Sequence, residues 1–361
     1  MAKTTRTGKS LIEIQKELGT EEQCVAFLES LRWPEGVRCL KCQGDKISRF
    51  ITEESTRKRV NKAGVEIKSI VPARHLYECL KPECGYQFSA TAGTIFNDTH
   101  LPLRKWMFAT AIMCNAKKGV SAKQLQRDLG VTYKTAWYLA QRIREAMMLG
   151  NLTDEKMTGT VEADETYVGG KYDKRRKRAR HEKEAVFGIV ERESGRVHAT
   201  HVPGKNHINR WQIGEVIDTT VDKSAQFMTD ESRLYGNLKG RGFDHEIVIH
   251  SDKEWVRGDV HTQSIDGFWG LLKRGIIGSF HQLSIKHLDR YVQEFCYRWN
   301  NQSNQQLFAV TIAALVLGIP LPYKKLVGEK SKRIVHNAKG VNQLTKTASG
   351  DSSETEQDLP F

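Results

Sequence analysis

No stretch of this sequence approaches the roughly 20 consecutive apolar residues that span a bilayer, which argues against a membrane-spanning helix. The opening residues MAKTTRTGKS also lack the apolar core of a secretory signal, so we expect a cytoplasmic protein. Thiols stay reduced in that compartment. The seven cysteines are therefore interpreted as metal ligands or small core residues, and not as a disulfide framework.

Acidic residues are in deficit, because 43 Asp and Glu stand against 56 Lys and Arg. The formal net charge is +13, and a positive excess of this size suits a polyanionic partner such as nucleic acid. A basic ribosomal or membrane-surface protein would share this balance, so the charge alone does not decide the class. At 361 residues the chain is long enough for two or three domains, each with its own core.

Four of the cysteines form two closely spaced pairs, Cys39 with Cys42 and Cys79 with Cys84. This spacing lets the two thiolates of each pair reach one tetrahedral zinc ion, and a glycine-containing turn follows each pair. The segment between the pairs carries strand-like patches, KISRFIT and VEIKSIV. Together these features predict a zinc ribbon with a hairpin extension. Four unrelated thiols are the alternative.

The other candidate zinc ligands are weaker. His75 lies close to the second cysteine pair, but no second histidine lies nearby. Cys24, Cys114 and Cys296 sit on apolar helical faces and are interpreted as core residues. The predicted ligand set is therefore the four paired cysteines.

Residues 102–149 have the pattern of helices. A capping box at Ser121 begins a short helix that Gly130 ends, and Thr132 begins the next helix. Two helices joined by a short glycine turn match a helix-turn-helix, with an ordinary helical hairpin as the alternative. The nearby cysteine pairs and the basic composition favour DNA binding. The residues that would then face a major groove are Thr132, Tyr133, Lys134 and Thr135.

From residue 158 the pattern changes to three strands with the features of an antiparallel set, then alternating helices and strands. Helices are expected near 207–220 and 231–238. This succession resembles the ribonuclease H-like order, in which carboxylates come from the first strand, the fourth strand and a late helix. Asp164, Asp230 and Asp266 occupy those three places. Magnesium prefers a few carboxylates with water and phosphate, and two such ions catalyse phosphodiester chemistry.

The late helix, expected over residues 262–276, has two distinct faces. Asp266 and Lys273 are seven residues apart, so they share a face at the edge of the apolar stripe. A carboxylate and a cation placed in this way suit a helix that lies across a phosphodiester backbone, whereas a solvated ion pair is the alternative. The apolar stripe that would pack on the sheet consists of Ile265, Phe268, Trp269 and Leu272.

The segment KYDKRRKRARHEK, residues 171–183, holds eight Lys or Arg and two acidic residues. It is either a solvated loop, a localisation-like patch or a segment that grips phosphates, and its place directly after the first carboxylate strand favours the last reading. The tail from about residue 329 is polar and is expected to be disordered. The candidate DNA contacts in the basic segment are Lys174, Arg175, Arg176, Lys177 and Arg178.

These segments resemble insertion-sequence transposases of the IS1595 type, whose catalytic part is called the ISXO2-like domain. The resemblance extends from about Glu21 to Asn301. Its specificity comes from the number and order of the matching segments: LRWPEGVRCLKC, QFSATAGTIF, MCNAKKGVSAKQLQRDLGVTYKTAWYLAQRIREAM, DETYVGGK, TDES, VRGDVHTQSIDGFWGLLKRGI and KHLDRYVQEFCYRWNN.

The resemblance implies a multi-domain α+β protein that cuts the ends of its element and joins them to target DNA. It also implies a structural Zn²⁺, two Mg²⁺ or Mn²⁺ ions, double-stranded DNA as partner, a homo-multimer that pairs two ends, and a bacterial, nucleoid-associated location without membrane. The expected parts are a flexible N-terminus (1–20), a zinc ribbon (21–98), a helix-turn-helix-like region (99–152), a ribonuclease H-like α/β catalytic domain (153–320) and a disordered tail (321–361).

Matched motif by motif, Asp164 and Asp230 carry the two aspartates, Asp266 the third acidic position and Lys273 the lysine that follows. The third position is commonly Glu, or Asn in some members, so the shorter Asp is a departure that could weaken one metal site. The alternative function is therefore a catalytically impaired or domesticated copy that acts as a DNA-binding regulator. A third possibility is a general ribonuclease H-like nuclease, but that function would not use the specific DNA-binding region near the N-terminus. His250 and His261 could assist proton movement but are interpreted as structural.

Overall fold

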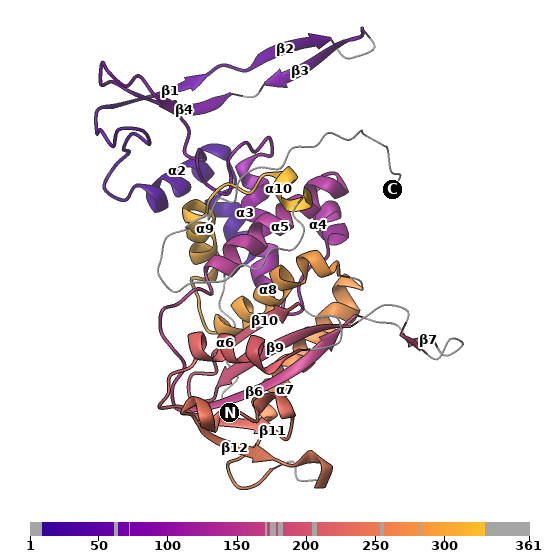
Figure 1. The fold of residues 1–361 in the computed structure, drawn as a ribbon. Coiled ribbons are helices and arrows are strands. Elements are labelled where there is room, and N and C mark those ends of the chain that lie inside the picture. Colours follow the sequence, from indigo (N-terminus) through magenta and orange to yellow (C-terminus); the bar gives the residue numbers. More distant parts are fainter. Residues whose placement is uncertain are drawn as a thin grey trace, which may run out of the picture.

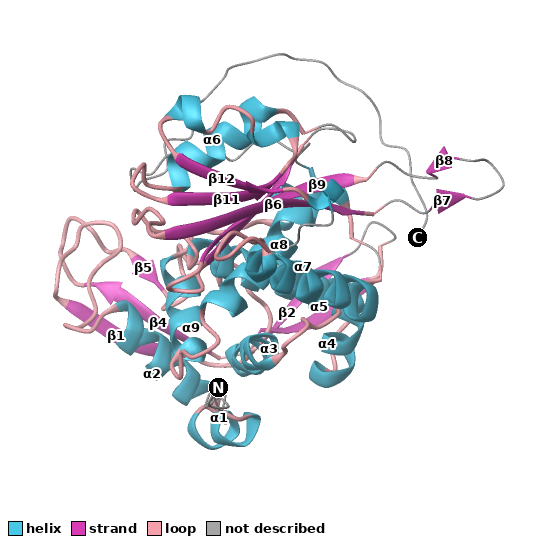
Figure 2. Ribbon diagram, turned by 90° about the horizontal axis from the view of Figure 1, so that it is seen from below, coloured by secondary structure: helices cyan, strands magenta, loops and turns pink. Residues whose placement is uncertain are grey.

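The computed structural model describes residues 9–60, 64–71, 73–169, 172–173, 178–179, 183–203, 208–252, 256–281 and 283–328. Three layers follow one another in Figure 1: small sheets at the top, a group of helices in the middle and a five-stranded sheet at the bottom. Figure 2 shows helices on both faces of the larger sheet. None of the helices in the described part of the chain is long and apolar enough to cross a membrane.

The N-terminal residues are more ordered than the sequence predicts. Helix α1 (Leu11–Glu17) begins at Ser10, whose side chain and that of Glu13 form a reciprocal capping box. Ile14 of this helix is fully buried. The prediction of a flexible segment over residues 1–20 is therefore wrong for residues 11–17, because one buried apolar side chain and a cap fix that turn, while residues 1–8 lie outside the described part.

The predicted strand patches belong to two small sheets. One sheet has the order β1 (Ile47–Thr52), β4 (Arg74–Cys79), β5 (Gln87–Phe88), and all its pairs are antiparallel. The other is the ribbon of β2 (Ser55–Val60) and β3 (Glu66–Val71). The hairpin extension expected between the cysteine pairs is this ribbon.

A helical layer follows the small sheets, and the predicted helix signals are present in it. The Ser121 side chain accepts a hydrogen bond from the Gln124 amide, and Thr132 accepts one from the Thr135 amide. Gly130 adopts the left-handed conformation that ends the short helix, with φ of 57°. These helices share one apolar core: α1, α2 (Glu21–Arg32), α3 (Leu103–Asn115), α4 (Ala122–Leu129), α5 (Tyr133–Leu149) and α9 (Leu307–Leu317).

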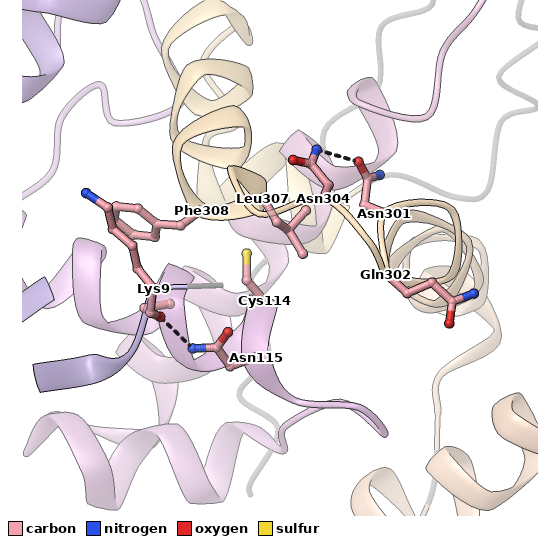
Figure 3. Close-up of a pocket in the computed structure, with 9 residues that line it drawn as sticks. Lys9, Cys114, Asn115, Asn301, Gln302, Asn304, Leu307 and Phe308 are labelled. Atoms are coloured by element: carbon pink, nitrogen blue, oxygen red, sulfur yellow. Dashed lines mark hydrogen bonds between the residues drawn. The ribbon is translucent and has the colours of Figure 1, made fainter. Parts of the chain in front are cut away.

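Cys114 belongs to this core and lies where α3 meets the start of α9 (Figure 3). Its thiol lies 3.3 Å from the Thr311 hydroxyl, and the nearby cavity of about 10 Å³ has room for one water at most. The Asn115 amide donates to the Lys9 carbonyl at 3.1 Å. Cys24, Cys114 and Cys296 are all buried, so their prediction as core residues is confirmed.

The chain after α9 also differs from the prediction. Residues 321–361 are expected to be disordered, yet α10 (Tyr323–Gly328) is helical and Leu321 and Leu326 are buried. The Tyr138 hydroxyl donates to the Leu321 carbonyl at 2.5 Å, which ties this segment to α5. Residues 329–361 lie outside the described part.

The larger sheet is mixed and has the order β10 (Val197–Val202), β9 (Glu184–Glu191), β6 (Thr160–Val168), β11 (Gln226–Asp230), β12 (Asp244–Val248). The first three strands along the chain are antiparallel, as predicted, and β11 and β12 run parallel to β6. The helix predicted near 231–238 is wrong. Two 3-10 turns, Arg233–Tyr235 and Lys239–Arg241, stand there because glycines follow each turn.

Helices cover the two faces of this sheet. On one face α6 (Arg210–Thr220) packs through Ile213 and Ile217. On the other face α7 (Gln263–Gly275) packs with α8 (Leu288–Asn300), and the predicted stripe of Ile265, Phe268, Trp269 and Leu272 is buried there. Alternate residues of β6 therefore face different helices.

A buried ion cluster fastens the helical layer to the large sheet. Arg144 of α5 and Arg298 both contact the carboxylate of Glu294 on α8, and all three side chains are buried. The Arg144 guanidinium also lies 4.0 Å from the ring centroid of Tyr291. Because an unpaired charge in this position would be very costly, α5 and α8 keep a fixed relation.

Candidate active site

The sheet register brings Asp164 and Asp230 to neighbouring positions. β6 and β11 are parallel, and their last recorded pair joins Glu162 with Met228. Asp164 and Asp230 lie two residues further along their respective strands. Neighbouring strands are about 4.8 Å apart, so the two aspartates, with 65 residues between them in sequence, lie side by side at this point of the sheet.

Asp266 comes to the same place on α7. It lies in the first turn of the helix, and the helix packs on β6 and β9. One turn further along, the Trp269 Nε1 donates a hydrogen bond to Oδ2 of Asp164 at 2.9 Å. The helix that carries the third carboxylate is therefore bonded directly to the first.

The electrostatics show the same gathering of carboxylates. Burial, followed by the charges of Glu165, Asp230 and Asp266, raises the pKa of Asp164 to about 7. A carboxylate surrounded in this way favours the binding of a cation. Among the described residues, the four paired cysteines form the group tight enough for one metal ion, with ligand atoms within 4.8 Å. The aspartates are arranged more openly.

Gly188 makes room for the Trp269 ring, which the sequence did not suggest. It lies in β9 directly opposite Asp164. A Cβ added at Gly188 would lie 2.6 Å from the Trp269 ring and 3.1 Å from Ile265, closer than such atoms normally come. Only a residue without a side chain lets the indole lie over the strand and reach Asp164.

Glu162 is a second residue whose role the sequence did not predict. It is fully buried, and its Oε2 accepts hydrogen bonds from the backbone amides of Ser264 and Ile265 at 2.8 and 3.0 Å. Its Oε1 lies 2.6 Å from the Arg192 Nε and 3.2 Å from the His261 Nδ1. A carboxylate at a helix N-terminus satisfies free amides and complements the helix dipole.

The position of Glu162 follows from strand geometry. Side chains alternate along a strand, so Glu162 and Asp164 point to the same face, toward α7. Arg192 completes the link, since it also donates to the carbonyls of Asp259 and His261 in the loop before α7. The interpretation of His261 as structural agrees with these contacts. The sequence Glu-Ala-Asp within a strand is the signal that could have predicted two carboxylates on one face.

Asp230 and Glu165 have their own partners. The Ser232 amide donates to Oδ1 of Asp230 at 3.0 Å. Glu165 points to the opposite face, where the buried Tyr235 hydroxyl donates to it at 2.6 Å. Burial raises the pKa of Glu165. Lys273 lies in the last turn of α7 and is exposed.

The four paired cysteines converge at the other end of the molecule. The Sγ atoms of Cys39 and Cys84 lie 3.7 Å apart, and those of Cys42 and Cys79 lie 3.6 Å apart. A tetrahedral zinc with Zn–S bonds of about 2.3 Å requires sulfur separations of about 3.8 Å. The geometry therefore fits one Zn²⁺ with four thiolate ligands.

The turns after each cysteine pair have the conformation of a thiolate knuckle. Gln43 and Gly85, the residues that directly follow the second cysteine of each pair, have φ of 59° and 52°. The Lys41 amide points to the Cys39 Sγ at 3.4 Å. His75 is not in the ligand group, as predicted; its Nδ1 is buried without a hydrogen-bond partner.

Comparisons with known proteins match the two regions of the chain that contain these residues. The transposase zinc-ribbon domain matches residues 19–87, and the ISXO2-like transposase domain of the IS1595 type matches residues 156–300. The chain belongs to the IS1595 transposase family. It is also similar to an uncharacterized protein in transposable element ISH50 of Halobacterium salinarum, with 26% identity over 300 residues that cover 78% of this chain and 92% of that protein.

The residues expected to contact DNA in this IS1595 family member are only partly described. At the start of α5, Thr132, Tyr133 and Lys134 are exposed and Thr135 is half-buried. The Lys134 Nζ lies 4.6 Å from the ring centroid of Tyr323 in α10. Arg178 lies in the short strand β8 (Arg178–Ala179), and the following expected contacts lie outside the described residues: Lys174, Arg175, Arg176 and Lys177.

Proposed function

We propose that this chain is a DNA transposase that binds the ends of its insertion sequence, cleaves them and joins the freed 3′-hydroxyl to target DNA. The observation that carries the proposal is the convergence of Asp164, Asp230 and Asp266 from β6, β11 and α7. These carboxylates come from the family's catalytic segment, which the ISXO2-like match covers. The proposed reaction first hydrolyses the phosphodiester and then transfers the strand.

The strand order supports a ribonuclease H-like catalytic domain. Three antiparallel strands occupy one side of the sheet, and two strands parallel to the first occupy the other. In the proposed domain the first strand, the fourth strand and the late helix each supply one acidic ligand. Asp164, Asp230 and Asp266 come from those three elements.

The donor atoms fit Mg²⁺, with Mn²⁺ as a substitute. Carboxylate oxygens, water and phosphate are the ligands that Mg²⁺ prefers. Burial first, and then neighbouring negative charge that a cation would relieve, raise the pKa of Asp164. In this proposal Asp164, Asp230 and Asp266 would together hold the ions, with Asp164 as the central ligand. Bound there, the ions supply activation of the attacking oxygen and stabilisation of the leaving oxygen.

The remaining residues position these groups. Trp269 holds Oδ2 of Asp164, so Oδ1 is the oxygen left to turn toward the reacting strand. The Ser232 amide orients Asp230 in the same way. Exposed Lys273, two helical turns beyond Asp266, contacts a backbone phosphate of the bound strand in this proposal.

The family's zinc ribbon and the helical layer provide the DNA-binding part of the proposal. We assign Thr132, Tyr133, Lys134 and Thr135 to the major groove, because they lie at the accessible N-terminal turn of α5. The proposed partner is double-stranded DNA, as element end and as target. Joining two ends in one reaction requires a homo-multimer.

A DNA-binding regulator with an impaired site is the second reading. It rests on Asp266, whose side chain is one methylene shorter than Glu and so loses roughly 1–1.5 Å of reach. The position of Asp266 on a helix bonded to Asp164 favours the enzyme.

The deciding experiment uses DNA that carries the ends flanking the gene, a supercoiled target plasmid and Mg²⁺. We expect the wild type to yield cleaved ends and joined products, and Asp164→Asn to yield neither while still binding the ends. Asp266→Glu is the matched test of the short carboxylate. If only that variant cuts, this copy is impaired; if all three proteins bind and none cuts, the regulator is correct.

A further inference from the structure

The β2–β3 ribbon extends from the zinc-binding sheet with little packed against it. Its six residue pairs run from Ser55 opposite Val71 to Val60 opposite Glu66, a length of roughly 20 Å. All six residues of β2 are exposed, and Val60 is 66% exposed. Figure 1 shows the ribbon reaching out along the top of the molecule, away from the five-stranded sheet.

The charge pattern of this ribbon is unfavourable for an isolated hairpin. Lys58 lies directly opposite Lys68, and like charges in facing positions destabilise a pair of strands. Glu66 compensates weakly, since it lies 3.7 Å from the Lys58 Nζ and both side chains are more than half exposed. Two-stranded ribbons are already marginal in water. An anion bound along the ribbon would remove this repulsion.

We propose that the β2–β3 ribbon, residues Ser55–Val60 and Glu66–Val71, is an arm that lies in a groove of duplex DNA. Arg57 and Arg59 project from one face and Lys58 from the other, because side chains alternate along a strand. The major groove is about 12 Å wide and admits a two-stranded ribbon. Basic side chains on both faces can then reach both phosphate walls of the groove. The inference rests on the proposed transposase function and names one of its DNA contacts.

The placement of the ribbon supports this role. Its strands continue from β1 and into β4. The zinc ligand Cys79 pairs with Ile47 at the far end of the β1–β4 ladder, so this ladder connects the arm to the metal centre. Figures 1 and 2 both place the ribbon on the side of the molecule where α4 lies. A duplex on the exposed start of α5 therefore lies on the same side as the arm.

The test measures the affinity of the zinc-loaded full chain for a fluorescent duplex carrying the gene's flanking end, over a series of salt concentrations. The test variant combines Arg57→Gln, Arg59→Gln and Lys68→Gln. The control variant removes the same charge from exposed lysines beside the large sheet, by changing Lys156, Lys223 and Lys239 to Gln. Zinc content and thermal melting of each protein establish that the folds are intact.

We expect the arm variant to bind about 10- to 100-fold more weakly at physiological salt, with the slope of log K against log salt reduced by about 3. The control variant should bind within about twofold of the wild type. Wild-type affinity and slope in the arm variant overturn the inference while leaving the transposase intact. Equal or tighter binding of an RNA duplex of the same sequence also overturns it. If the wild type does not bind the end duplex, the proposed function fails first.

Discussion

The Trp269 indole donates a hydrogen bond to Oδ2 of Asp164, with Nε1 and Oδ2 2.9 Å apart. This bond joins the helix that carries Asp266 to the strand that carries the central carboxylate. Gly188 provides the space for it, and Glu162 holds the beginning of the same helix. The arrangement of the acidic residues thus depends on three residues that are not themselves expected to touch metal or DNA.

Trp269→Phe keeps an aromatic ring in the core but removes the donor to Asp164. We expect a loss of about 1 kcal/mol of stability and a roughly tenfold slower cleavage of end DNA, because Asp164 is free to rotate. Binding of the ends should not change. Trp299→Phe is the matched control, since its Nε1 donates to the Gly195 carbonyl away from the carboxylates. Equal cleavage by the two variants would refute the positioning role.

Gly188→Ala should displace the Trp269 ring and lower the free energy of unfolding by about 1–3 kcal/mol. The reason is specific, because the added Cβ meets the outer edge of the indole. A smaller ring lacks those atoms, so the same substitution in a Trp269→Phe background should be less costly. Chemical denaturation of the wild type, both single variants and the double variant measures this. Strictly additive effects would contradict the contact.

Glu162→Gln removes the charge that Arg192 and the first amides of α7 share. We expect about 2–3 kcal/mol of lost stability, because hydrogen bonds to a charged group are replaced by weaker ones in a buried place. Hydrogen exchange of the Ser264 and Ile265 amides should accelerate more than exchange elsewhere in the sheet. Glu184→Gln, which alters the buried pair with His201, serves as the control. If hydrogen exchange accelerates uniformly across the sheet in both variants, Glu162 does not act locally at the start of α7.

The pKa of Asp164, raised to about 7, makes metal binding dependent on pH. Below pH 7 a proton must leave before a cation binds, so Mg²⁺ affinity should rise up to about tenfold per pH unit there and level off above pH 8. Calorimetric titration of the wild type and Asp164→Asn at several pH values tests this. Affinity that does not change between pH 6 and pH 8 would contradict a metal ligand at Asp164 with a pKa near 7.

The same raised pKa has a consequence for metal-free stability. The folded state holds a proton that the unfolded state, with its ordinary pKa near 3.8, has already lost. The free energy of unfolding should therefore fall by about 4 kcal/mol as pH rises from about 4 to above 7. In Asp164→Asn this part of the decrease should be absent. Parallel stability curves for the two proteins would be inconsistent with the burial described.

Zinc removal should unfold the small three-stranded sheet, since its core is little more than the cysteine cluster with Tyr77, Phe88 and Ala90. We expect the zinc-loaded protein to show a separate melting transition for this sheet. A chelator should abolish that transition and weaken binding of the element ends, while the large sheet keeps its own core. Cys79→Ser should mimic the chelator. Melting that is unaffected by chelation would rule out a structural metal.

Much of this architecture could be predicted from local signals. Cysteine spacing gave the zinc ligands, and caps and glycines marked α4 and α5. Asp164 was expected on the first of three strands after residue 158, and that strand is β6. Each of these signals lies within a few residues of the feature it predicts.

What could not be predicted depends on contacts between distant segments. The functions of Gly188 and Glu162 follow from strand register and from how α7 packs, which local patterns do not specify. The order of α1 and α10 has the same origin. A few buried side chains, such as Ile14 and Leu326, fix segments whose composition alone favours disorder.

The most direct test of the active site compares the wild type with Asp164→Asn, Asp230→Asn and Asp266→Asn in Mg²⁺-dependent cleavage of the element's end duplex, with affinity for the same duplex measured in parallel. We expect cleavage by the wild type, at least about 100-fold slower cleavage by each variant, and affinities within about twofold of one another. Cleavage at the wild-type rate by any one variant would contradict the assignment of that carboxylate, and with it the three-carboxylate site.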